Sequence, residues 1–139
     1  MAGIIDRRKI TCTITIADNG TLSTLGGISN NLGEDPADGI LDLSRYAYGT
    51  ITSPAAWVAA DIAFLVCGTR AGTYLPLNDK TGVLVRITGV STTAAEEYEI
   101  PAQVFMAGPF VKIQSTNTAS EATVSQTGGP LSFKLCLGT

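Results

Sequence analysis

The chain has 139 residues and a formal charge of −3, and Asp, Glu, Lys and Arg together make up only 15% of it, against about a quarter in an average soluble protein. This length suits a single domain, residues 1–139, with a core large enough to need no disulfide or metal ion. The acidic balance excludes nucleic acid as the main partner, because affinity for phosphate requires a basic surface.

Residues 1–9 are the candidate N-terminal arm of the domain. Their apolar segment is too short for a signal peptide, and no later segment approaches the apolar length of a membrane span. We therefore expect a soluble protein without a membrane partner, which stays in the compartment where it is made. Residues 7–9 (RRK) form a basic cluster. They belong either to a solvated strand entrance or to an arm that binds an acidic neighbour.

Apolar and hydroxylated side chains alternate without a break in residues 10–16 (ITCTITI). A period of two places every second side chain on one face, which predicts a strand with one buried side. Asn19-Gly20 follows and supplies the positive φ that a tight hairpin turn requires. The chain is therefore expected to double back after its first strand.

A long loop is predicted at residues 26–39, which contain four glycines, one proline and several turn formers. Short strands are expected next, at residues 40–43 and 46–51. They lead into residues 52–57, a segment of small side chains that ends in a tryptophan.

Further short strands separated by turns are predicted in the second half of the chain. The apolar positions of residues 62–66 share one face of a strand, and those of residues 83–87 mark another. Single helical turns are candidates at residues 93–97 and 102–108. Other strands are expected at residues 110–114 and 131–137, with polar loops at 89–96 and 115–120. The predicted fold is all-β: an antiparallel β-sandwich, jelly-roll-like, with seven or eight strands and long loops.

Catalytic machinery is sparse in this sequence. The chain has no histidine, which removes the commonest general base, the usual serine and cysteine triads and the commonest metal ligand. Its glycines form no phosphate-binding motif. Acidic side chains remain as candidate glycosidase pairs, although carboxylates in polar loops are usually only solvated: Asp61 with Asp79, or Glu96, Glu97 and Glu99. We expect no enzyme and no cofactor.

Two places carry the oxygen ligands that calcium prefers. One is Glu34-Asp35 with Asp38, and the other is Asn78-Asp79. Turn-forming Asp and Asn residues explain both places equally well, so no metal site is assigned.

The aromatic residues have two interpretations. Flat rings stack on sugars, and a glycan platform could draw on Trp57, Tyr46, Tyr48 and Tyr74. Core packing is the simpler use. Trp57 is flanked by alanines, which predicts a large plug among small neighbours at one end of the sandwich.

The three cysteines, Cys12, Cys67 and Cys136, are odd in number and widely spaced. This pattern suits a reducing compartment and favours thiols that act as small apolar side chains.

Because few residues are charged, Thr, Ser, Asn, Gly and Ala must cover much of the surface. Such a surface loses little ionic hydration when another protein covers it, which favours a protein that works in an assembly.

The middle of the chain resembles a group of small β-sandwich structural proteins encoded among the virion genes of tailed bacteriophages. The resemblance is carried by residues 52–67 (TSPAAWVAADIAFLVC), residues 72–79 (GTYLPLND) and Gly82. The strand at 111–115, Gln126 and the last strand at 131–137 extend it, so that it covers about residues 40–137. One departure lies at residues 67–72 (CGTRAG), where the group shows Ser-x-Asp-Gly.

The resemblance implies a non-enzymatic virion protein that decorates or cements the capsid exterior and is made in the host cytoplasm. Its implied partners are the major capsid protein and further copies of itself, as a trimer or another homo-oligomer. Recognition is expected in three loop regions, residues 1–9, 26–39 and 115–126, because loops on a rigid scaffold commonly carry it. Two other functions stay open: a carbohydrate-binding or adhesion module, and a tail or connector component of the same virion.

Overall fold

The computed structural model describes residues 9–29 and 38–139, and this part of the chain contains ten strands and one short helix. The all-β prediction is confirmed. More strands form than the seven or eight expected, because β6 and β8 have only two and three residues and are too short to show a period of two. β7 lies within the strand predicted at residues 83–87. The elements are β1 (Lys9–Ile16), β2 (Ser23–Ile28), β3 (Ile40–Asp42), β4 (Tyr48–Thr52), β5 (Asp61–Cys67), β6 (Leu75–Pro76), β7 (Arg86–Ile87), β8 (Glu97–Glu99), α1 (Ala102–Met106), β9 (Phe110–Thr116) and β10 (Leu131–Gly138).

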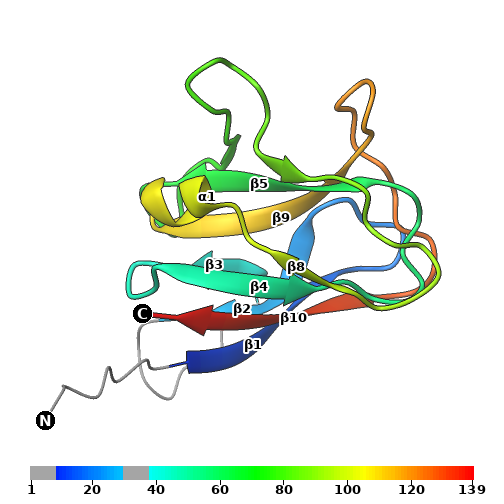
Figure 1. Cartoon of the computed structure of the whole chain (residues 1–139), viewed down its shortest axis with the longest axis horizontal. Helices are drawn as coiled ribbons and strands as arrows, with labels where there is room; N and C mark the ends of the chain where they lie inside the picture. Colours follow the sequence, from blue (N-terminus) through cyan, green and yellow to red (C-terminus); the bar gives the residue numbers. More distant parts are fainter. Residues whose placement is uncertain (1–8, 30–37) are drawn as a thin grey trace, which may run out of the picture.

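The strands follow one path in the order β6-β5-β9-β3-β2-β1-β10-β4-β8, with β7 also paired to β5. The sheet curls, so that β5 and β9 lie above β4, β10 and β1 (Figure 1). β2 and β3 pair in parallel, whereas the other named strand pairs are antiparallel. The expectation of a purely antiparallel arrangement therefore fails at this one pair, and the sheet is mixed.

Two glycines in β2 allow the chain to pass from one half of the sheet to the other. Gly26 lies opposite Ile14 of β1, and Gly27 lies opposite Ile40 of β3. Both have positive φ, 69° and 117°, and a Cβ atom at either would collide with the neighbouring backbone. The loop predicted at residues 26–39 was therefore wrong at its start, since β2 continues to Ile28; its residues 30–37 lie outside the described chain.

β1 and β10 confirm the alternation in the sequence. They pair over their whole length, from Lys9 opposite Gly138 to Ile16 opposite Leu131. On β10 the side chains alternate between the core and solvent, with Phe133 fully buried and Lys134 exposed. A strand of this kind has one buried face and one free face.

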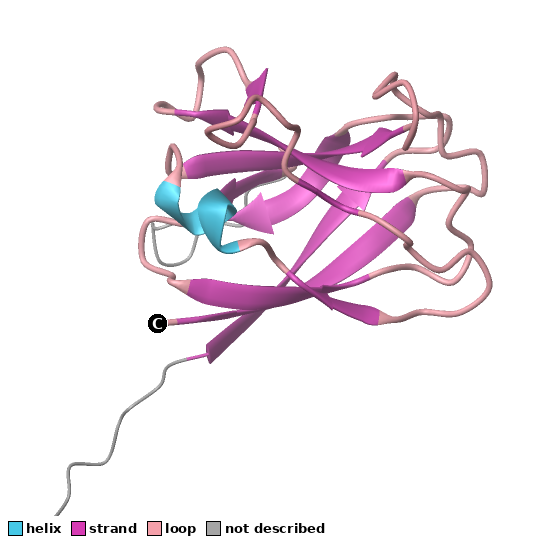
Figure 2. Ribbon diagram, turned by 45° about the horizontal axis from the view of Figure 1, so that its top comes forward, coloured by secondary structure: helices cyan, strands magenta, loops and turns pink. Residues whose placement is uncertain are grey.

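The core fills the space between the two halves of the curled sheet. Its largest fully buried side chains include Ile14, Phe64, Ile113 and Phe133, which come from β1, β5, β9 and β10. Figure 2 shows α1 near one end of the strands, on the side where the C-terminus lies. The helical turn expected at residues 102–108 is confirmed, whereas residues 93–97 form none and end in β8. No helix in the described part of the chain is long and apolar enough to cross a membrane.

Candidate interaction surface

The outward side chains of β1, β10, β4 and β8 form one continuous surface. Alternation along the strands and the pairing between them place these side chains on the same side, away from the core. No described element covers this side in either overall view (Figures 1 and 2). We call this surface the threonine face; its members are Lys9, Thr11, Thr13, Thr15, Tyr48, Thr50, Thr52, Glu97, Glu99, Ser132, Lys134 and Cys136.

Hydroxyl groups dominate the threonine face. Thr15 Oγ1 and Ser132 Oγ share a hydrogen bond of 2.9 Å across β1 and β10, and the Thr50 hydroxyl donates to Glu97. The cation Lys134 lies on β10, whereas the acids lie on β8 at the edge of the sheet. Hydroxyl groups cost less to desolvate than ions, so the hydroxyl side chains of this face suit burial against another protein.

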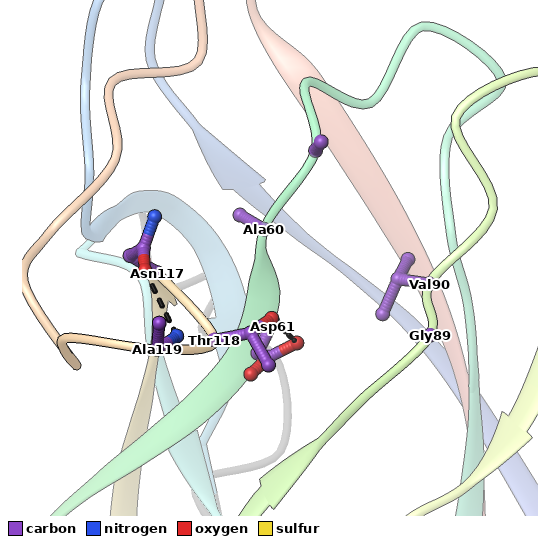
Figure 3. A pocket seen from close by; sticks show the side chains of 8 residues that line it. Ala60, Asp61, Gly89, Val90, Asn117, Thr118 and Ala119 are labelled. Atoms are coloured by element: carbon purple, nitrogen blue, oxygen red, sulfur yellow. Dashed lines mark hydrogen bonds between the residues drawn. The ribbon is translucent and has the colours of Figure 1, made fainter.

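A pocket of about 420 Å³ opens beside the start of β5. Residues 59–61, 89–90 and 117–119 line it, and Figure 3 shows Asp61 between the two loop segments. Most of its lining side chains are small or apolar. Asp61 is the only ionisable residue among those that line it, so any acid–base chemistry there would depend on this carboxylate.

Asp61 acts as a structural clamp rather than as a free acid. Its Oδ1 accepts a 2.9 Å hydrogen bond from the Thr118 hydroxyl, and its Oδ2 lies 3.4 Å from Arg86 Nη1. Arg86 Nη1 also donates to the backbone oxygen of Asn117 at 3.5 Å. Because the Asp61 residue is only 1% exposed, its carboxylate is closed to a substrate in the pocket, and the ion pair ties β5 and β7 to the loop after β9.

The candidate pair of Asp61 and Asp79 does not form a common site, because the two residues line different pockets. Asp79 Oδ1 accepts hydrogen bonds from the Thr81 backbone and hydroxyl and from the Val83 backbone. The Thr81 hydroxyl is the main cause that lowers the pKa of Asp79 below its ordinary value, and the backbone donors add to it. Asp79 therefore organises its own turn.

The three glutamates near β8 line none of the three pockets described for residues 9–29 and 38–139. Glu96 accepts a 3.0 Å hydrogen bond from the Tyr98 hydroxyl, and Glu97 is bonded to Thr50 on the neighbouring strand. Glu97 and Glu99 are exposed on the threonine face. They give this edge of the sheet its negative charge.

Asp38, the described member of the first calcium candidate, is bound by an arginine. Arg70 Nε and Nη2 donate to its two carboxylate oxygens, each at 2.9 Å. Burial alone would raise the pKa of Asp38, but the hydrogen bond and charge of Arg70 outweigh it, so this pKa lies below its ordinary value. Glu34 and Asp35 lie outside the described chain. Within the described residues, no group of three or more His, Cys, Asp or Glu side chains could hold a metal ion.

Trp57 packs in the core, as expected for a plug. It is 2% exposed, meets the Phe133 ring edge-to-face at 5.2 Å and donates its indole N–H to the Ala60 oxygen at 3.0 Å. Tyr74 donates its hydroxyl to the Arg70 backbone oxygen, and Lys112 Nζ lies 4.7 Å from its ring centre. Burial raises the pKa of Tyr74 to about 12. These contacts leave no platform shared by Trp57 and Tyr74 for a sugar.

The three thiols are free and partly buried. Burial raises the pKa of the Cys12 thiol to about 11, with a smaller contribution from Cys136. A raised pKa keeps a thiol protonated and unreactive. Cys12 packs against the core as a small apolar side chain would.

Gln126 is an anchor inside the polar loop that was expected to carry recognition. It is fully buried; its side chain bonds the Val58 backbone through both its oxygen and its nitrogen, and its nitrogen also donates to Ser115 Oγ. Residues 117–123 of the same loop are exposed. The sequence interpretation placed recognition in loops and missed the threonine face, although its signal was visible in the alternating runs at residues 10–16 and 131–137.

No protein-family model, no curated protein and no solved structure matches the chain.

Proposed function

We propose that the chain is a non-enzymatic structural protein of a tailed-bacteriophage virion, which decorates or cements the capsid by bridging neighbouring capsid subunits. The observation that carries this proposal is the threonine face, a sheet surface rich in hydroxyl side chains that no described element covers. The resemblance of residues 40–137 to virion proteins supports a capsid as the assembly, with the tail or connector of the same virion as the alternative. The acids examined above, bound in clamps and turns or exposed on β8, support a binding role over an enzymatic one.

In this proposal the curled sheet acts as a jelly-roll-like sandwich, one half of which presents the threonine face to the capsid. Each contact of this kind is weak, because hydroxyl groups contribute modest free energy. Many copies on a symmetric shell add such contacts together, since symmetry repeats them and linked copies rebind at high effective concentration.

Purified virions of the phage that encodes this chain provide the direct test. Mass spectrometry should find the chain in many copies per particle, and its absence from particles would overturn the proposal. Electron microscopy of particles carrying a labelled chain should place the label on the capsid. A label confined to the tail or connector would assign the chain to that part of the virion and overturn the capsid role.

A charge placed on the threonine face tests the surface itself. Thr13→Arg should lower the occupancy of capsids by roughly tenfold or more, because the guanidinium would have to be desolvated without a partner. Thr127→Arg is the matched control, since Thr127 is exposed in the loop before β10 and is not a member of this face. Equal loss of occupancy in both variants would contradict a role for the threonine face.

A further inference from the structure

Two strand edges are open at opposite ends of one run of four strands. β8 ends the described path beyond β4, so that one side of Glu97–Glu99 has no strand partner there. On β1, pairing with β2 begins only at Ile14. Residues 9–12 are therefore paired with β10 alone within the described chain. Exposed backbone donors and acceptors at such an edge can pair with another strand.

The two open edges carry opposite charges on the same face of the sheet. Glu97 and Glu99 project onto the threonine face from β8, and Lys9 projects onto the same side from β1. Arg45 lies beside Lys9, where both line a pocket of about 360 Å³ with Ile10 and Tyr46. The β1 edge is thus basic and also exposes the apolar side chain of Ile10, whereas the β8 edge is acidic.

We propose that the occupant of the β1 edge is β8 of a second copy of this chain, so that copies join edge to edge into a closed homo-oligomer. This contact deepens the structural role proposed above and rests on it for its purpose. Because β1 and β8 are different surfaces, the contact is head-to-tail, and such contacts form rings when the rotation between copies closes.

The strand directions select an antiparallel contact. β1, β10, β4 and β8 alternate in direction, so a second copy in the same orientation continues the alternation when its β1 follows β8. In an antiparallel pair each residue lies directly across from one residue of the neighbouring strand. Opposed side chains of opposite charge, or an aromatic opposed to an aliphatic side chain, stabilise the pairing.

One register satisfies charge and burial together. With Glu99 opposite Lys9 of the next copy, Tyr98 lies opposite Ile10 and Glu97 lies opposite Thr11. Ile10 is 39% exposed and Tyr98 is half-buried, so both side chains gain cover on the core side. On the other side, Glu99 meets a cation and Glu97 meets a hydroxyl, as it already does at Thr50.

Cysteine cross-linking tests this register in solution. In a background with Cys12, Cys67 and Cys136 replaced by alanine, Thr11→Cys with Glu97→Cys should oxidise to a ladder of covalent multimers, because directly opposed strand residues lie within disulfide distance. Thr15→Cys with Glu97→Cys is the matched control. Thr15 lies on the same face of β1 but where β2 already pairs with it, so this variant should give no ladder.

Charge exchange tests the same contact without cysteines. Lys9→Glu or Glu99→Lys should each weaken self-association by about fivefold, measured by analytical ultracentrifugation at low salt. The double variant Lys9→Glu/Glu99→Lys should restore it. Both substitutions are on exposed side chains, and unchanged circular dichroism and unfolding midpoints of the three variants should show that the fold is intact.

Three results would overturn the edge contact: a chain that stays monomeric at high concentration, equal cross-linking in the Thr15 control, or a double exchange that fails to restore association. None of them bears on the presence of the chain in virions, so failure here is distinguishable from failure of the capsid role. A chain that forms multimers in solution but is absent from particles would retain the contact and refute the capsid role.

Discussion

β10 and β5 both lie inside the sheet, yet they are covered in different ways. On β10 every second side chain from Leu131 to Leu135 is buried, and those between are exposed. On β5 the first five residues are all buried, although only Ile62 and Phe64 among them belong to the main core cluster. A strand with one covered side presents a surface, and a strand with two covered sides supports the fold.

The cover on the second side of β5 comes from the segment before β6. Leu65 lies opposite Lys112 on β9, and Lys112 in turn lies under the Tyr74 ring. Tyr74 is fixed by its hydroxyl bond to Arg70. The threonine face has no such cover among the described elements, which is why it is the better candidate for contact with a partner.

The largest difference in unfolding free energy is expected between a truncated side chain on the covered side of β5 and one on the uncovered side of β10. Leu65→Ala should cost about 2–5 kcal/mol of unfolding free energy, as for a buried leucine, whereas Ser132→Ala on the threonine face should stay within about 0.5 kcal/mol. Urea unfolding followed by tryptophan fluorescence measures both, because Trp57 lies in the core. A small loss for Leu65→Ala would mean that the second side of β5 is not covered in solution.

The ion pair at the start of β5 should show the next largest effect. Arg86→Met leaves the Asp61 carboxylate buried without its cation and should cost about 3 kcal/mol, near the lower end for a broken buried pair, since Arg86 keeps some exposure. Asp61→Asn/Arg86→Met removes both charges and should recover most of that loss. Chemical unfolding of the single and double variants checks this, and an additive double variant would contradict the clamp.

The smallest effect is expected at the Asp38–Arg70 pair, which lies on the segment that covers β5. The carboxyl group of Asp38 has a lower pKa in the folded protein than in the unfolded chain, where it is about 4. Its contribution to stability is therefore complete above about pH 4, and it is lost as the pH falls through the pKa of the folded state. Asp38 is 42% exposed, so solvent screening limits it to about 1 kcal/mol at most. Asp38→Asn should therefore flatten the fall in stability below about pH 4, measured by urea midpoints against pH. If Asp38→Asn left the loss of stability below about pH 4 unchanged, the ion pair between Asp38 and Arg70 would not be formed in solution.

The strands with strong periodicity could be predicted from the sequence, and the short ones could not. The alternation at residues 10–16 and 131–137 records burial on one side, which local sequence contains. β6 and β8 have two and three residues, so no period is visible in them, and their places depend on pairing with β5 and β4. Gly26 and Gly27 signalled a loop, but they serve a bend within β2 that only the approach of β1 and β3 explains.

The threonine face could be predicted only in part. The sequence identifies Thr11, Thr13 and Lys134 as outward side chains of their strands. It does not give the register that places Thr52 of β4 and Glu97 of β8 in the same row, because these strands are far apart along the chain. A surface assembled from strands that are distant in sequence cannot be predicted without knowing how those strands pair. A turn such as the one that Asp79 organises can be predicted, because it depends only on residues nearby in the sequence.

The direct pairing of the first and last described strands has a consequence for synthesis. β10 separates β1 from β4 in the sheet, so a nascent chain that lacks β10 has a gap between them. Contacts between strands this distant in sequence form slowly, and strands without a partner are prone to aggregate until β10 has paired with them. The sheet between β1 and β4 can therefore close only after β10 has left the ribosome, which favours early strands that stay in solution, as the threonines of β1 help them to do.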